Sequence, residues 1–252
     1  MKNSKLRRVL MLVACAVLLV SLSVGATLAY LTATTKTVTN TFTVGNVSFD
    51  ESLNGGLDEA KTDVYGVPQK KDTTDPDNPK DVPVTSVADA YRVTENSYKL
   101  IPGHEYTKDP TVHLAAGSEN CYVFVYINKT DLLYTATGAT TATDIEAATV
   151  EGGYQRIAAQ IAANGWTDMT PAGHTAGKLF VYNSTVNTLD GNNKDLKIFE
   201  KFMLAGDAVL PNSTEAAQLQ IKITAYAIQA DGFASAQAAW DHSGFTLQFP
   251  TT

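Results

Sequence analysis

The segment CYVFVYI, residues 121–127, is the most apolar strand pattern in the second half of the sequence's first 130 residues and indicates the fold class. Successive side chains of a β-strand point to opposite faces, so Val123, Val125 and Ile127 share one face. The other face carries three aromatic residues. A strand that is apolar on both faces lies in the middle of a sheet that is covered on both sides. The sequence therefore predicts a sheet protein with this strand at its centre.

Shorter strand patterns surround this stretch. They lie at residues 90–93, 97–101, 111–115, 178–182, 196–202 and 218–225. Asp190-Gly191 is a hairpin signal and predicts that the strands before and after it pair with each other. Helical spacing predicts one helix over residues 154–162, and a second, short helix that Asp231 caps. About eight strands in antiparallel hairpins with one or two inserted helices predict an all-β fold, a jelly-roll-like antiparallel β-sandwich.

Residues 50–82 differ in composition from the rest of the chain. They are rich in charged residues, Pro and Gly and poor in apolar residues. Such a segment buries too little surface to offset its ordering entropy, which predicts a mobile loop with a short strand near 64–67. Four acidic residues offer a calcium loop as an alternative to a solvated turn: Asp72, Asp75, Asp77 and Asp81. Their spacing lacks the Gly and the bidentate Glu of an EF-hand.

The N terminus has the layout of a secretory signal peptide. Lys and Arg residues precede an apolar core from Val9 to Leu22, and small residues follow. Ala26 and Ala29 fit a signal peptidase, which predicts cleavage before Tyr30. The predicted organisation is a signal peptide, 1–29, and a single secreted domain, 30–252. An uncleaved anchor is the alternative, because residues 9–31 suffice for a span of roughly 20 residues.

The sequence predicts no disulfide bond between the two cysteines. Cys15 lies in the predicted signal, so only Cys121 remains in the secreted chain. The residues before Cys15 resemble a lipoprotein cleavage box, but they leave an apolar core shorter than the ~7 residues that such a signal needs. Cys121 begins an apolar strand, which predicts a buried, inert thiol.

The charge of the chain argues against nucleic-acid binding. The chain has 19 Lys and Arg residues against 26 Asp and Glu residues. The four basic residues of the predicted signal leave with it, so the secreted part is more acidic still. An acidic domain repels phosphate backbones, and no basic stripe offsets this repulsion. Contact with a membrane is expected only through the signal peptide before cleavage.

The segment that follows the predicted cleavage point has a two-sided pattern. In TKTVTNTFTV, residues 35–44, Thr alternates with Val38, Phe42 and Val44. This alternation predicts a strand with one apolar and one hydroxyl-rich face, within an N-terminal Thr-rich strand over 30–49. A free strand of this kind can add to the exposed sheet edge of a second copy, with its main chain donating hydrogen bonds and the apolar side chains filling pockets. Pairing within its own domain is the alternative.

These N-terminal residues carry a resemblance to a known family. GATLAYLT, residues 25–32, and VTNTFTVGNV, residues 38–47, are similar to the export segment and first strand of the TasA/camelysin family. The similarity covers about the first fifty residues and returns in patches at 98–103, 108–112 and 120–125. It implies processing by a SipW-type signal peptidase and a surface or biofilm-matrix fibre of a Gram-positive bacterium.

The resemblance also raises peptidase chemistry, because camelysin is described as a metallopeptidase. A zinc hydrolase needs convergent His and Glu ligands, typically two His four residues apart on one helix. The weak candidates are His104, Glu105 and His113, which lie in a predicted turn and a predicted strand. No His-Glu-x-x-His motif and no Gly-x-Ser-x-Gly motif occurs. The sequence therefore predicts no catalytic site, no metal and no cofactor.

Three classes of function follow from the sequence. The first is a secreted structural protein of the extracellular matrix or cell surface, a fibre subunit that binds copies of itself or other matrix proteins. The second is a monomeric surface or binding protein of the same fold. The third is a camelysin-like metallopeptidase.

Overall fold

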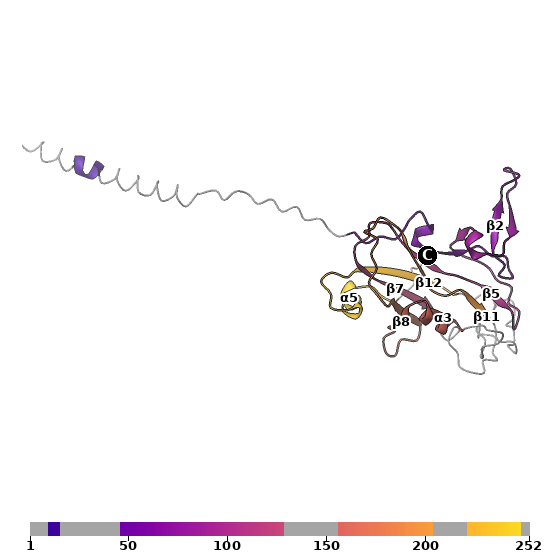
Figure 1. Cartoon of the computed structure of the whole chain (residues 1–252). Helices are drawn as coiled ribbons and strands as arrows, with labels where there is room; N and C mark the ends of the chain where they lie inside the picture. Colours follow the sequence, from indigo (N-terminus) through magenta and orange to yellow (C-terminus); the bar gives the residue numbers. More distant parts are fainter. Residues whose placement is uncertain (1–9, 16–45, 129–155, 204–220, 248–252) are drawn as a thin grey trace, which may run out of the picture. The chain divides into compact units, whose positions relative to one another are not determined.

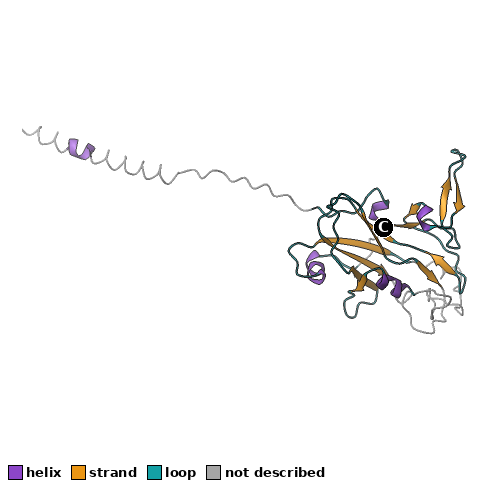
Figure 2. Ribbon diagram, viewed as in Figure 1, coloured by secondary structure: helices purple, strands orange, loops and turns teal. Residues whose placement is uncertain are grey.

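The computed structural model describes residues 10–15, 46–128, 156–203 and 221–247. The chain divides into two units, Met1–Val44 and Gly45–Thr252. In the first unit the described residues, 10–15, are helical. All strands of the structure lie in the second unit, which is shown in Figures 1 and 2.

The central sheet contains the stretch that the sequence singled out. Its four strands lie in the order β12-β7-β9-β8, and all neighbours are antiparallel. The bounds are Cys121–Asn128 for β7, Trp166–Asp168 for β8, Gly177–Tyr182 for β9 and Ile223–Gln229 for β12. Ile223 pairs with Ile127, and Val181 pairs with Phe124. The prediction that residues 121–127 form an inner strand is confirmed.

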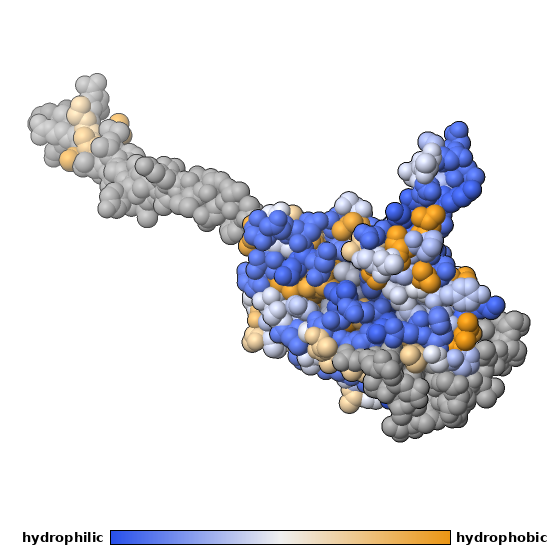
Figure 3. Space-filling model, turned by 45° about the vertical axis from the view of Figure 1, so that its right-hand side comes forward, coloured by the Kyte–Doolittle hydropathy of each residue, from blue (hydrophilic) through white to orange (hydrophobic). Residues whose placement is uncertain are grey.

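A second four-stranded sheet has the order β10-β6-β1-β4. Its strands are β1 (Leu57–Ala60), β4 (Arg92–Val93), β6 (Thr111–Leu114) and β10 (Lys194–Lys197). Two smaller sheets pair β5 (Glu105–Thr107) with β11 (Lys201–Met203), and β2 (Gln69–Asp72) with β3 (Lys80–Pro83). The β2–β3 hairpin projects from the body of this unit (Figure 1), and its projecting part is hydrophilic in Figure 3.

The two large sheets enclose one apolar core. Val112 and Leu196 of the second sheet and Val125 and Phe180 of the central sheet belong to the same buried cluster. The opposite face of the central sheet has its own cluster, in which Trp240 packs on the others. Both faces of β7 are therefore covered, as its sequence requires. The all-β class predicted from the sequence is confirmed.

Four short helices accompany the sheets in the described part of this unit. Their bounds are η1 Asn54–Gly56, η2 Val87–Asp89, α3 Ile157–Ala163 and α5 Ala236–Ser243. The predicted helix near 154–162 is confirmed as α3, and its Ile157 and Ile161 enter the core. The second predicted helix is present as α5, but the predicted cap residue is wrong. Ser235, not Asp231, caps α5 by accepting a hydrogen bond from the Ala238 backbone N–H.

The loop predicted over residues 50–82 is also wrong in part. This range holds β1, β2 and β3, and Ala60 in β1 is completely buried. The predicted strand near 64–67 is a turn instead. The prediction treated acidic residues of this range as exposed. Asp58 and Glu59 are instead buried, because each forms an ion pair with a basic side chain that is distant in the sequence.

Candidate functional site

The outer edge of β12 is the first element of the candidate site. β12 ends the central sheet, and β7 is its strand partner within the described ranges. The Asn128 N–H donates to the Lys222 carbonyl at 3.1 Å, and the Ala230 N–H donates to the Asn120 carbonyl at 2.7 Å. Along an antiparallel strand, the backbone N–H and C=O groups of successive residues point alternately toward the partner strand and away from it. The N–H and C=O groups of residues 223, 225, 227 and 229 therefore point outward.

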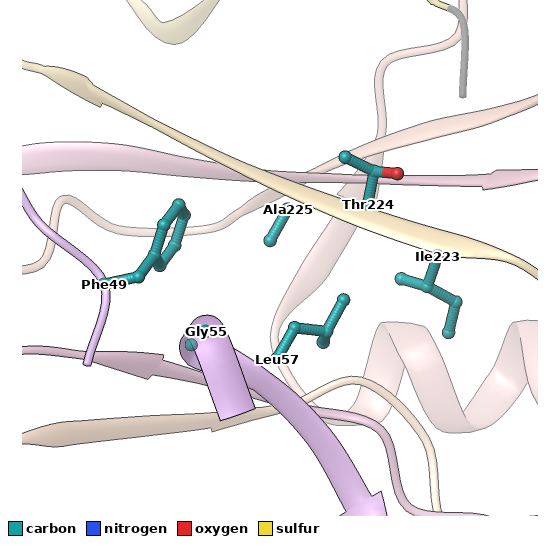
Figure 4. Close-up of a pocket in the computed structure, with 7 residues that line it drawn as sticks. Phe49, Gly55, Leu57, Ile223, Thr224 and Ala225 are labelled. Carbon is teal, nitrogen blue, oxygen red and sulfur yellow. The ribbon is translucent and has the colours of Figure 1, made fainter. Parts of the chain in front are cut away.

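A groove lies beside this edge and forms the second element. It has a volume of about 210 Å³ and opens between β12 and the start of β1. Its lining is mostly apolar: Phe49, Gly55, Gly56, Leu57, Ile223, Thr224 and Ala225. Figure 4 shows Ile223 of β12 and Leu57 of β1 approaching the same space from opposite sides, with Phe49 beside them. An exposed strand edge thus runs along a space that accepts apolar side chains.

The wall opposite β12 is formed by an interrupted strand. Phe49 bridges to Leu114 of β6, and Leu57 then pairs with Val112 of the same strand. Between these two positions the chain leaves β6, turns through η1 and returns. The turn needs positive φ angles at Asn54, Gly55 and Gly56, namely 51°, 77° and 85°. Glycine adopts this region without steric cost, which explains the Gly-Gly pair at the groove.

Gly56 has a second reason to be glycine. A Cβ at Gly56 would lie 2.2 Å from the Cβ of Phe49, whereas a Cβ at Gly55 would meet no atom within 4 Å. The side chain of Phe49 can therefore rest against the turn only because Gly56 lacks a side chain. The two glycines together set the shape of the groove.

The predicted donor-strand residues Val38, Phe42 and Val44 lie outside the described residues, as do Ala26, Ala29 and Tyr30. The described part of the domain begins at Asn46, whose carbonyl accepts a hydrogen bond from the Glu119 N–H at 2.8 Å. In sequence, the Thr-rich segment thus ends directly before the residues that form one wall of the groove. No sequence pattern indicates the groove itself, because its two walls are formed by residues 49–57 and 223–225, which are far apart in the chain.

The predicted metal-ligand candidates are held by separate contacts. His104 Nε2 lies 2.9 Å from the Tyr65 carbonyl, and Glu105 forms an ion pair with Lys201 at 2.9 Å. His113 has Nε2 2.8 Å from Asp58 Oδ1 and Nδ1 2.7 Å from Asp195 Oδ1. Across the described residues, no group of three or more His, Cys, Asp or Glu side chains could hold a metal ion.

The acidic residues proposed as a calcium loop also have local partners. Asp72 accepts hydrogen bonds from the backbone and hydroxyl of Thr74, and these bonds lower the pKa of Asp72. Asp75 accepts a hydrogen bond from the Asp77 N–H, and Asp81 forms an ion pair with Lys71 at 2.7 Å. Each of these contacts belongs to a turn or to the β2–β3 hairpin.

A buried charge network, which the sequence analysis missed, surrounds β1. Asp58, Glu59 and Asp109 are at most 3% exposed. Arg92 contacts Asp58 at 2.8 Å and Asp109 at 2.6 Å, while Lys108 contacts Glu59. Burial lowers the pKa of Arg92, but its bonds to Asp109 and Asp58 outweigh this effect and raise it. No local sequence signal reveals such a network, because its members come from three separate segments.

We compared the chain with protein families, curated proteins and solved structures. No family model, curated protein or solved structure matches the chain. In the ranges that the structure describes, no helix is sufficiently long and apolar to traverse a lipid bilayer.

Proposed function

We propose that this protein is a secreted structural subunit of a biofilm matrix or cell-surface fibre, assembled by donor-strand addition. The observation that carries the proposal is the outward-facing edge of β12 beside an apolar groove. An unpaired strand edge is a template for another strand. A groove next to it supplies the pocket in which side chains of that strand lose contact with water.

The proposed donor is the Thr-rich segment of a second copy. Residues 35–44 contain no Pro and have Thr at every odd position, with Val38, Phe42 and Val44 among the even positions. Their main chain would pair with the N–H and C=O groups of residues 223, 225, 227 and 229, and Val38, Phe42 and Val44 would supply the side chains for the groove. Each subunit would thus complete the central sheet of its neighbour. Because this head-to-tail contact does not close on itself, repetition gives a filament.

The remaining parts of the proposal rest on the sequence. The basic residues, apolar core and Ala26 and Ala29 favour export and cleavage before Tyr30 by a SipW-type peptidase. Cleavage would release the donor segment as a free N terminus. The two sheets around one core suit a jelly-roll-type sandwich, which we propose as the finer description of the fold. The local contacts of His104 and His113 favour structural roles over a camelysin-like peptidase activity.

The test compares filament formation by the exported protein with that of two variants. The first variant lacks residues 35–44. The second is Ala225→Pro, which removes an outward N–H of β12 and leaves the bonds to β7 in place. Ala225→Val is the matched control, because it adds similar bulk but keeps the N–H. Mass spectrometry identifies the N terminus, and light scattering with negative-stain microscopy follows assembly as concentration rises.

We expect filaments from the wild type and from Ala225→Val, and monomers from the other two variants. Filaments from the chain without residues 35–44 would show that this segment is not the donor. A wild type with the expected N terminus that stays monomeric at all concentrations would contradict the fibre function and favour the monomeric surface protein.

A further inference from the structure

We propose that Lys108 and Asn96 become joined by an intramolecular isopeptide bond, which the protein forms itself with Glu59 as the catalytic residue. Glu59 contacts both partners. Its Oε2 accepts a hydrogen bond from Lys108 Nζ, and its Oε1 accepts one from Asn96 Nδ2 at 2.9 Å. A carboxylate that holds an amine and a carboxamide together is the arrangement needed for amide exchange between them. The proposal is independent of the fibre function.

The fold brings these residues together from three places. Glu59 lies in β1, Asn96 follows β4, and Lys108 lies between β5 and β6. Glu59 is 3% exposed and Lys108 is 9% exposed, values that are unusual for these residue types. Asp58 and Glu59 are successive residues of a strand, so Glu59 lies on the opposite side of β1 from the contacts of Asp58 with Arg92 and His113. The Lys108–Glu59 pair is therefore separate from that part of the charge network.

The carboxamide of Asn96 is fixed in the orientation that the reaction needs. Its Nδ2 donates to the Ala60 carbonyl at 2.8 Å as well as to Glu59. Its Oδ1 accepts a hydrogen bond from the Thr62 N–H at 2.9 Å. Negative charge develops on this oxygen when an amine adds to the amide carbon, and a backbone N–H aimed at it stabilises that charge. The nitrogen that must leave faces the residue that can protonate it.

The reaction is balanced without any co-reactant. Lys108 transfers one proton to Glu59, and its neutral Nζ attacks Cγ of Asn96 to form the new C–N bond. The Cγ–Nδ2 bond then breaks. Glu59 returns its proton to the departing nitrogen, and the second proton on the attacking nitrogen follows through the same carboxylate. The departing nitrogen, which carries both of these protons, leaves as an ammonium ion. No atom is oxidised or reduced, and Glu59 is regenerated as a carboxylate.

The surroundings favour this chemistry because they are poor in water. Tyr98 lies beside the site, with its hydroxyl donating to the Thr107 carbonyl at 3.0 Å and its ring 5.1 Å from that of Phe202. Burial raises the pKa of Tyr98, and the negative charge of Glu59 adds to this effect. Burial also favours transfer of a proton from an ammonium to a carboxylate, since both groups become neutral.

The test is a tryptic digest of the purified, folded wild-type protein. Such a digest does not depend on where the N terminus is cut. Trypsin cleaves after Arg92, Lys99 and Lys129, but not after a lysine whose amine has become an amide. We expect a single branched product in which residues 93–99 are joined to residues 100–129, with a mass lower than the sum of the two peptides by one ammonia. Fragmentation should place the bond between Asn96 and Lys108.

Three variants identify the roles. Lys108→Arg keeps a positive charge next to Glu59 but cannot form the amide, and Glu59→Gln keeps the shape but cannot transfer the protons. Both should lose the branched product completely. Lys99→Arg, a neighbouring lysine whose Nζ lies over the ring of Tyr65, is the matched control and should retain it. Circular dichroism verifies that each variant is folded.

Every outcome decides a part of the proposal. Unlinked peptides 93–99 and 100–108 as the main products of the folded wild type would overturn it, whatever the variants do. A branched product that persists in folded Glu59→Gln would overturn the catalytic role of Glu59. A bond located at another lysine or asparagine would overturn the pairing of Lys108 with Asn96.

Discussion

The guanidinium of Arg92 contacts the carboxylate of Asp109, with Nη1 2.6 Å from Oδ2. Asp109 is 2% exposed, and its other oxygen accepts a hydrogen bond from the Ala60 N–H. Arg92→Met would remove the cation and leave the carboxylates of Asp109 and Asp58 buried without it. Removal of one partner of a buried ion pair costs about 3 kcal/mol or more. We expect a loss of this size in the free energy of unfolding, measured by urea denaturation.

Lys71→Met is the control for this prediction. Lys71 forms an ion pair with Asp81, but both side chains are more than a third exposed. Exposed pairs contribute little to stability, because water and salt screen the attraction between the charges. Equal losses for Arg92→Met and Lys71→Met would contradict the special role of the buried network.

The two glycines of the groove should respond differently to alanine. Both have positive φ angles, so either substitution costs about 1 kcal/mol in backbone strain. At Gly56 the new Cβ would in addition overlap Phe49, which raises the expected loss of stability to about 2–4 kcal/mol. Thermal and urea unfolding of Gly55→Ala and Gly56→Ala measure the difference. Similar stabilities would mean that Phe49 does not rest against this turn.

The thiol of Cys121 should be unreactive in the folded protein. Burial raises the pKa of Cys121 to about 11, and Sγ lies 3.3 Å from the Val186 carbonyl oxygen. At about pH 8 the thiol is therefore protonated, and a disulfide reagent should modify it at least about a hundredfold more slowly than in denatured protein. The measurement uses Cys15→Ser, because Cys15 is exposed. Rapid modification of the native protein would contradict the buried, inert thiol.

Buried tyrosines should make the fold sensitive to alkali. Burial raises the pKa values of Tyr98, Tyr106, Tyr126 and Tyr226 above the usual value. Their contribution to stability is complete below about pH 10, the pKa of an unfolded tyrosine, and is lost as the pH rises through the folded pKa values. Absorbance and circular dichroism during an alkaline titration should show that these phenols ionise together with unfolding. Ionisation of all tyrosines near pH 10 without unfolding would contradict this.

The sequence predicted the parts of the fold that depend on short-range patterns. The apolar character of both faces of β7 predicted an inner strand, and the spacing of Ile157 and Ile161 predicted a buried helix face. It did not predict which strands pair. Asp190-Gly191 does form a turn, but β10 after it pairs with β6, while β9 before it pairs with β7 and β8. A turn signal describes four residues and carries no information on distant partners.

The candidate sites show the same limit. The Thr-rich segment could be predicted as a strand, because alternation is a local property, and this prediction concerns residues outside the described ranges. The edge and groove at Ile223 and Leu57 were not, because these residues meet only in the folded chain. Glu59 likewise resembled a loop residue, since Lys108 and Asn96, which make its burial tolerable, lie outside its own segment.

The pairing of β7 with β12 also governs when the protein can fold. Ile127 of β7 pairs with Ile223 of β12, and this pair can form only after Ile223 has been synthesised, late in translation. Such long-range contacts slow folding, because a large loop must close before they form. A nascent chain therefore cannot complete its central sheet until almost all of it has left the ribosome. Until then the edge of β7 that faces β12 has no partner strand.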